Sequence, residues 1–179
     1  MPVDPSKIWL FKIIPLQNLE SVLEVGLFCK NAERDDAGYI TLGSKEVITR
    51  RGATEVKCFK GTYVNDYVPF YFSVRTPMLY NIKTGHGVPP MAQENIIYLC
   101  FRLQDLITGE FQWCFTDGNE DRIRKKHSEF LVRHHVPSDK ILRIVVLNND
   151  AAVKVQELLK RMGVEIEVRI DHKGTFYFL

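Results

Sequence analysis

Two charged side chains, far apart in the sequence, are candidates for chemistry. Arg51 follows Arg50 and precedes Gly52, and two adjacent guanidinium groups could hold a pyrophosphate through paired hydrogen bonds. Glu129 begins the apolar run EFLV, and a carboxylate at a cleft could hold a sugar hydroxyl or stabilise an oxocarbenium-like transition state. Each has an ordinary alternative: the arginines as surface charge, and Glu129 as the outward position of an alternating strand.

The stretch 64–85 is rich in aromatic side chains. Alternate residues of a strand point to opposite faces, so Tyr67, Phe70 and Tyr71 cannot all face one core. We expect one set to line a cleft, where flat rings would stack on a nicotinamide, an adenine or an unpaired base. Arg75 and Met78 follow as a cationic and a soft apolar contact. A strand buried on both faces would explain the same composition equally well.

Motifs for other kinds of chemistry are missing. The four cysteines are widely spaced without a C-x-x-C pair, so we expect free thiols in a reducing compartment and no metal site. The run Lys60-Gly61-Thr62 lacks the glycine pattern of a P-loop, and there is no G-x-G-x-x-G or H-E-x-x-H motif. His134 and His135 are adjacent, which would turn them to opposite faces of a strand.

The chain has 179 residues, which predicts a single domain over 1–179 with a sizeable core. Its net charge of +2 implies no partner, but basic residues cluster between 122 and 135, which indicates either a nucleic-acid contact or a solvated helix face. No apolar run is long enough to span a membrane, and no signal peptide pattern is present. We therefore expect a cytoplasmic protein without a membrane partner.

The elements that must position these residues are mostly strands. Apolar and alternating runs predict strands at 8–14, 68–74, 96–102, 111–115, 128–132, 141–147, 164–170 and 175–179. Helical spacing predicts helices at 18–26, 45–51, 105–108 and 150–162, the last with Val153, Leu158 and Leu159 facing inward. Many strands with few helices indicate an α+β fold with a largely antiparallel sheet.

Several blocks together resemble one known family, the DarT proteins. The blocks occur in one order over nearly the whole chain: DYVPFYF (66–72), RTPMLYNIKTG (75–85), QENIIYL (93–99), FTDG (115–118), RKKHSEFLVRHHVP (124–137) and GVEIEV (163–168). The resemblance implies an ADP-ribosyltransferase-like split antiparallel β-sandwich with few helices. It also implies a toxin that transfers ADP-ribose from NAD onto a base of single-stranded DNA, thymidine in the best-known branch, and a macrodomain antitoxin partner of the DarG type.

The resemblance also implies roles for individual residues. Glu129 would be catalytic at the nicotinamide ribose, and Arg51 would bind NAD and take part in catalysis. The other implied NAD contacts are Lys12, Ile13, Ile14, Asn18 and Tyr71. The implied nucleic-acid contacts are Arg75, Met78, Arg122, Arg124, Lys125 and Lys126.

The sequence departs from the family pattern at three places. The segment PLQNL (15–19) stands where the family has a His-bearing HIDNL-like segment, and Asn119 stands where a His usually follows FTDG. The segment between that turn and Glu129 is also shorter than in the family. These departures leave open a target of another base or RNA, a binding module with weakened catalysis, and an NAD glycohydrolase.

Overall fold

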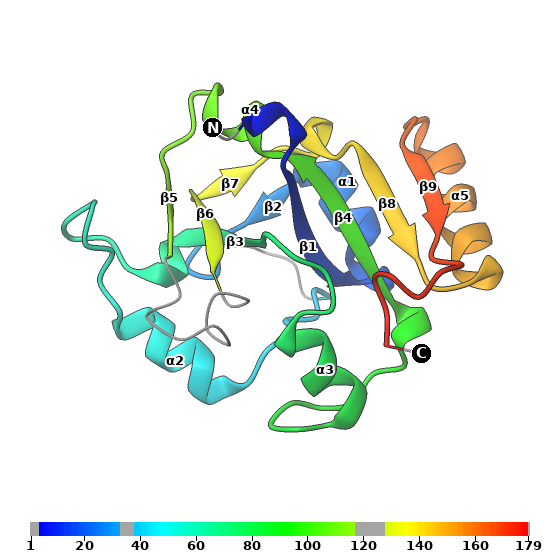
Figure 1. Ribbon diagram of the computed structural model, residues 1–179, viewed down its shortest axis with the longest axis horizontal. Coiled ribbons are helices and arrows are strands. Elements are labelled where there is room, and N and C mark those ends of the chain that lie inside the picture. Colours follow the sequence, from blue (N-terminus) through cyan, green and yellow to red (C-terminus); the bar gives the residue numbers. More distant parts are fainter. Residues whose placement is uncertain (1–3, 33–37, 117–127, 179) are drawn as a thin grey trace.

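The computed structural model describes residues 4–32, 38–116 and 128–178. Seven strands form one sheet in the order β5-β6-β3-β1-β4-β8-β9, and β2 pairs with β7 in a second, small sheet (Figure 1). The strands are β1 (Trp9–Pro15), β2 (Leu27–Phe28), β3 (Tyr67–Tyr71), β4 (Ile96–Arg102), β5 (Trp113–Phe115), β6 (Glu129–Arg133), β7 (His135–Val136), β8 (Arg143–Val146) and β9 (Glu167–Ile170).

Within the described ranges, five α-helices accompany the sheet. They are α1 (Leu19–Val25), α2 (Lys45–Ala53), α3 (Pro77–Thr84), α4 (Leu103–Ile107) and α5 (Asn149–Met162). The strand pairs are antiparallel except β8 and β9, which are parallel and joined by α5 as their crossover helix. The predicted α+β class with a mostly antiparallel sheet is confirmed.

The two sides of β1 are paired very differently. Towards β4, β1 forms a continuous ladder of seven pairs, from Trp9–Arg102 to Pro15–Ile96. Towards β3, it forms one pair, Phe11–Tyr71. We call these boundaries the closed seam and the open seam, and the candidate site lies along the open seam.

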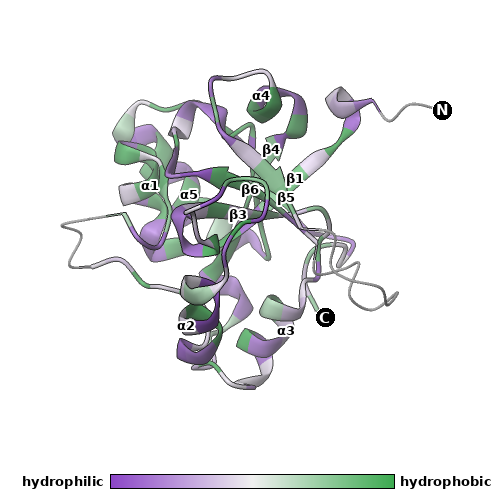
Figure 2. Cartoon of the chain, turned by 90° about the vertical axis from the view of Figure 1, so that its left-hand side faces the viewer, coloured by the Kyte–Doolittle hydropathy of each residue, from purple (hydrophilic) through white to green (hydrophobic). Residues whose placement is uncertain are grey.

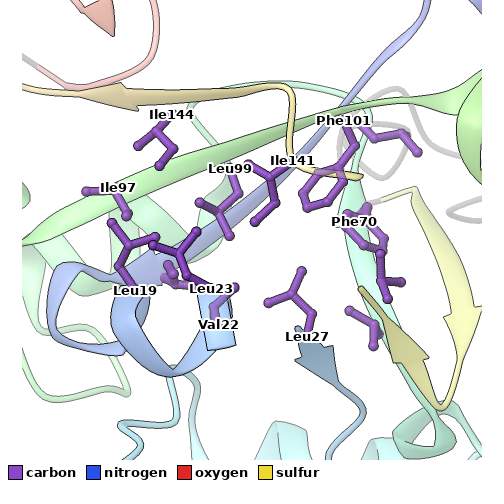
Figure 3. Packing of buried hydrophobic residues seen from close by; sticks show 14 of the residues in the cluster. Leu19, Val22, Leu23, Leu27, Phe70, Ile97, Leu99, Phe101, Ile141 and Ile144 are labelled. Carbon is purple, nitrogen blue, oxygen red and sulfur yellow. The ribbon is translucent and has the colours of Figure 1, made fainter. Parts of the chain in front are cut away.

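The main core lies where α1 and α5 cover one face of the sheet. In Figure 3 Leu19, Val22 and Leu23 of α1 point towards Ile97 and Leu99 of β4. These five side chains are at most 6% exposed, so the helix spacing read from the sequence matches a real apolar face. The core therefore packs against one face of β1 and β4, the two strands of the closed seam.

Helices α2 and α3 lie together at another end of the molecule, away from α1 and α5 (Figures 1 and 2). Helix α2 is largely hydrophilic in Figure 2 and contributes no fully buried residue. Helix α3 begins at Thr76, whose hydroxyl accepts from the N–H of Leu79 at 3.2 Å, and it ends at Gly85 in the left-handed conformation.

The structure corrects three expectations. Residues 175–178 form no strand, because the Asp171 carboxylate folds them into a turn. Val153 is 52% exposed, since Ala152, Val155 and Leu159 make the inward face of α5. Helix α3 was expected only as part of an aromatic stretch, although its Thr cap, its first-turn proline and its closing glycine are typical helix signals.

Candidate active site

Arg51 and Glu129 meet directly. The Arg51 Nη1 donates to the Glu129 Oε2 at 2.6 Å. Arg51 lies in the last turn of α2, while Glu129 is the first residue of β6. The Glu129 side chain is 11% exposed and that of Arg51 24% exposed, so the pair is withdrawn from bulk water yet reachable from one side.

The backbone of Glu129 is held on both sides, by the residue that follows β5 and by the end of β3. Its N–H donates to the Thr116 hydroxyl and its carbonyl accepts from the Thr116 N–H, both at 2.9 Å. On the other side Glu129 pairs with Tyr71 at the end of β3. The carboxylate is therefore held at the point where three strands end together.

Arg51 is positioned by a contact between α2 and the turn before β3. The Asn65 side-chain amide donates to the Ile48 carbonyl at 2.9 Å. A Cβ at Gly52 would lie 3.0 Å from the same amide nitrogen, tighter than most contacts of this kind. The glycine after Arg51 thus allows the helix to approach Asn65 closely.

A cavity of about 650 Å³ opens beside the pair, a size typical of small-molecule sites. Its walls come from β1, β2, β3, α2, α3 and the segment 39–43, which are far apart in the sequence. Tyr67, Pro69 and Tyr71 of β3 face this cavity, whereas Val68 and Phe70 belong to the main core. The aromatic strand thus divides between core and cleft, one of the two outcomes that alternation allowed.

Lys12 of β1 also lines the cavity. Burial lowers the pKa of its ammonium group to about 8, against the opposing attraction of Glu129, and Arg51 lowers it further. Burial, followed by the charge of Glu129, raises the pKa of the Tyr71 hydroxyl well above its ordinary value. The described cavity lining thus carries four cationic side chains, Lys12, Lys30, Arg50 and Arg51, and one carboxylate, Glu129, and the Tyr71 hydroxyl beside them stays protonated.

Asn18 lines the cavity but uses its side chain for structure. Its amide nitrogen donates to the Ile40 carbonyl at 2.8 Å, and its amide oxygen accepts from the Ile40 N–H at 2.9 Å. This exchange copies a pair of backbone bonds and fixes the wall 39–43. Ile13 and Ile14 supply apolar lining beside it.

The predicted nucleic-acid contacts separate into three groups. Met78 of α3 lines the cavity. Arg75 is not among the lining residues, and its guanidinium donates to the carbonyls of Gly174 and Tyr177. Arg122, Arg124, Lys125 and Lys126 lie outside the described residues.

Sequence reasoning did not single out Asn65, Asn81 or the segment 39–43. The cap signals of α3 would have placed Asn81 on the same helix as Met78. Nothing comparable marks Asn65 or 39–43, because their roles depend on contacts between distant segments.

Comparison with known proteins assigns the family. A sequence profile described as "ssDNA thymidine ADP-ribosyltransferase, DarT" matches residues 11–122 and 119–178. This chain belongs to the DarT family. The two matched stretches overlap at 119–122, within the segment before Glu129 that we expect to be shorter than in other DarT proteins.

Curated DarT relatives are named DNA ADP-ribosyl transferase. The chain is 31% identical over 118 residues to one from Escherichia coli, covering 65% of this chain and 54% of that protein. It is 28% identical over 205 aligned positions to one from Thermus sp. (strain 2.9), covering 97% and 98%. The chain thus spans about half the length of the Escherichia coli relative, and the Thermus alignment is longer than this chain, so that relative has residues this one lacks.

Solved DarT structures share the fold. Thermus sp. 2.9 DarT in complex with ADP-ribosylated ssDNA matches with a TM-score of 0.86 at 23% identity, covering 99% of both chains. The same protein in complex with NAD+ gives 0.80 at 22% identity, covering 99% and 100%. Thermosipho africanus DarTG in complex with ADP-ribose gives 0.77 at 19% identity, covering 96% of this chain and 51% of that one.

The described residues lack two further kinds of feature. They include no group of three or more His, Cys, Asp or Glu side chains placed to hold a metal ion. Across the same ranges, no helix has both the length and the apolar character to cross a membrane.

Proposed function

We propose that this DarT protein transfers ADP-ribose from NAD onto a base of single-stranded DNA, with thymidine as the base that the family description names. The observation that carries the proposal is the 2.6 Å contact between Arg51 and Glu129 inside a cavity of suitable size. Related structures support it, since Thermus DarT was solved with NAD+ and with ADP-ribosylated ssDNA.

The residues of the cavity fit a dinucleotide substrate. Arg51 has five N–H donors, so it can keep Glu129 in place and still bind a phosphate oxygen. Lys12 adds a second cation beside it. Glu129 offers a carboxylate oxygen to a ribose hydroxyl, and the protonated Tyr71 hydroxyl can donate a further hydrogen bond.

The transfer breaks the bond between nicotinamide and the ribose anomeric carbon. Nicotinamide leaves with the bonding electron pair, and positive charge develops on the sugar. Glu129, whose backbone is bonded to Thr116 and whose carboxylate is bonded to Arg51, is preorganised to stabilise that charge at a ribose hydroxyl. A base nitrogen then bonds to the anomeric carbon and loses its proton.

The acceptor must be unpaired. A base stacked in a duplex cannot bring its nitrogen to the anomeric carbon, so the enzyme needs single-stranded or flipped substrate. Met78 and Tyr71 line the cavity between α3 and Glu129 and offer the apolar and aromatic surface that such a base requires.

The biological setting is also proposed. A toxin role with a DarG-type macrodomain antitoxin follows from the family, and the solved structure of Thermosipho africanus DarTG supports such an association. Modification of cellular DNA agrees with the cytoplasmic location that the sequence predicts.

The test is incubation with NAD and single-stranded oligonucleotides that each contain one kind of base, followed by mass spectrometry. We expect one ADP-ribose added to thymidine-containing strands, and none with Glu129→Ala. RNA strands test the alternative acceptor. Nicotinamide release without an acceptor would instead indicate a glycohydrolase, and calorimetric NAD binding without any adduct would indicate a binding module.

A further inference from the structure

The last described residues, 171–178, form an ordered segment that follows β9 and folds back past the end of β4 towards α3 (red in Figure 1). The Asp171 carboxylate accepts from the backbone N–H groups of Thr175, Phe176 and Tyr177 at 2.8, 2.7 and 3.1 Å. One carboxylate thus sets the shape of the whole turn. We call residues 171–178 the C-terminal latch.

The latch is anchored to the closed half of the sheet. The Tyr177 side chain is 0% exposed, and its hydroxyl lies 2.8 Å from the Ile96 carbonyl and 3.0 Å from the Val145 carbonyl. The Gln93 amide pairs with both backbone groups of Phe178, at 2.7 and 3.0 Å. These contacts fix the segment on β4 and β8.

Arg75 ties the chain before α3 to the latch. Its Nε donates to the Tyr177 carbonyl at 3.2 Å, and its Nη2 donates to the Gly174 carbonyl. Its backbone N–H donates to the Tyr98 hydroxyl at 3.3 Å, and that hydroxyl donates to the Phe176 carbonyl at 3.1 Å. Arg75 has a φ of 53°, unfavourable for a residue with a Cβ unless surrounding contacts hold it.

Helix α3 lies between the latch and the cavity. On the latch side Leu79 and Ile82 pack with Tyr177 in one cluster, and the Lys83 Nζ donates to the Phe178 carbonyl at 2.8 Å. On the other side, the helix contributes three lining residues to the cavity: Pro77, Met78 and Asn81. A shift of the latch would therefore move a wall of the cavity.

We propose that the C-terminal latch is a positioning element of the substrate site and that Arg75 acts through it, holding α3 where its cavity-facing residues receive the acceptor base. This inference rests on the proposed function for the identity of the base. It differs from a direct contact between Arg75 and nucleic acid, because the Nε and Nη2 groups of Arg75 bind carbonyls of the latch and Arg75 does not line the cavity.

Gln93 separates the two interpretations, because it binds the latch without lining the cavity. Gln93→Ala removes both hydrogen bonds to Phe178, and Arg75→Lys keeps the positive charge but loses the planar fork. The matched control is Arg161→Ala, which breaks an exposed ion pair with Glu20 on other elements. If Arg75 instead contacts nucleic acid directly, only Arg75 variants should have impaired turnover. Arg75→Lys should then be the least impaired of them, because it keeps the positive charge.

The first readout is hydrogen exchange of the free protein, which needs no substrate. We expect Gln93→Ala and Arg75→Lys each to speed exchange of α3 amides about tenfold, the scale of one or two lost hydrogen bonds, with no change in Arg161→Ala. Unchanged α3 exchange in Gln93→Ala would overturn the proposal. Because this readout involves no NAD or DNA, it stands even if the proposed reaction fails.

The second readout is turnover with NAD and oligonucleotide. We expect both variants to raise KM for the oligonucleotide and to leave kcat at saturation near that of the unaltered protein, because Arg51 and Glu129 are untouched. If KM for the oligonucleotide rises in Arg75→Lys but is unaltered in Gln93→Ala, Arg75 contacts the nucleic acid directly. That result would overturn the proposed positioning role of the latch.

Discussion

The closed and open seams of β1 differ in what their side chains do. Along the closed seam, seven consecutive pairs join β1 to β4, and every β4 residue from Ile96 to Phe101 is at most 1% exposed. Along the open seam, one pair joins β1 to β3, and Lys12, Arg51 and Glu129 gather beside it. One strand thus serves both a continuous ladder and a cavity.

The difference shows how the strand pairing of β1 is distributed between its two neighbours. A strand with a full ladder on one side keeps its position even when the other side is nearly unpaired, which leaves room for a substrate between strands. Charges can then be placed at the open seam without disrupting the core, because the main core lies against α1 and α5. We expect substitutions at the closed seam to act on stability and those at the open seam to act on turnover.

The largest effect should follow truncation at the closed seam. Leu99→Ala removes a fully buried side chain of β4 and should lower the free energy of unfolding by about 2–5 kcal/mol through lost burial and a residual cavity. Denaturant unfolding measures this change. Val153→Ala, at a position 52% exposed on α5, is the control and should change stability by about 0.5 kcal/mol or less. Equal losses in both variants would show that burial at the closed seam does not determine stability.

The next effect concerns the open seam. Arg51→Ala should lower kcat about 100-fold, the scale for losing one preorganised electrostatic partner, while the unfolding midpoint should change less than in Leu99→Ala, because Lys12 remains as a cation near the Glu129 carboxylate. Arg51→Lys restores charge but not the fork, so we expect only partial recovery. Oligonucleotide modification rates and denaturant unfolding check this together, and a large stability loss with normal turnover would contradict it.

Much of the closed seam could be predicted from the sequence. The apolar runs at 8–14 and 96–102 indicated β1 and β4 within one residue of their observed ends, because fully buried strands are continuous apolar runs. Helix α5 was predicted from its periodicity, but Val153 was assigned inward. The final strand was wrong because one side chain, the Asp171 carboxylate, binds the backbone N–H groups four to six residues later and turns the chain there, which strand patterning does not register.

The open seam could be predicted only in part. Family resemblance selected Arg51 and Glu129, and the structure brings them into contact, but no spacing rule connects an α2 residue with the start of β6. Arg75 shows the opposite case. A cation beside aromatic residues indicated a nucleic-acid contact. In the structure its Nε and Nη2 groups bind carbonyls 102 and 99 residues later in the chain, and local sequence carries no sign of those contacts.

A smaller effect concerns the charge at Lys12. Because its pKa is about 8, the ammonium group is mostly charged at about pH 7 and mostly neutral at about pH 9. A cation attracts the anionic pyrophosphate, so Kd for NAD should rise about tenfold as pH increases across that range. Calorimetry at several pH values measures it.

Two variants control the Lys12 prediction. Lys12→Arg keeps its charge throughout, so its Kd should not vary with pH in this range. Lys12→Met should bind weakly at every pH. If Lys12→Arg keeps the slope of the unaltered protein, another group titrates, and Lys12 is not the cation that NAD meets.

The smallest effect should come from alkylating Cys58, which tests whether the edge of the sheet beyond the open seam stays closed. Cys58 is exposed, whereas Cys29, Cys100 and Cys114 are buried, and burial raises the pKa of Cys100 and Cys114 to about 12. Iodoacetamide near neutral pH should label Cys58 alone in the folded protein and leave turnover unchanged, since Cys58 does not line the cavity. Peptide mapping after labelling gives the site, and Cys58→Ser should abolish it. Cys114 lies in β5 opposite Leu131 of β6, so labelling of Cys114 would show that β5 separates from the strand that carries Glu129. The β5–β6 pairing would then be less stable than the β1–β4 pairing by more than the difference in the number of paired residues predicts.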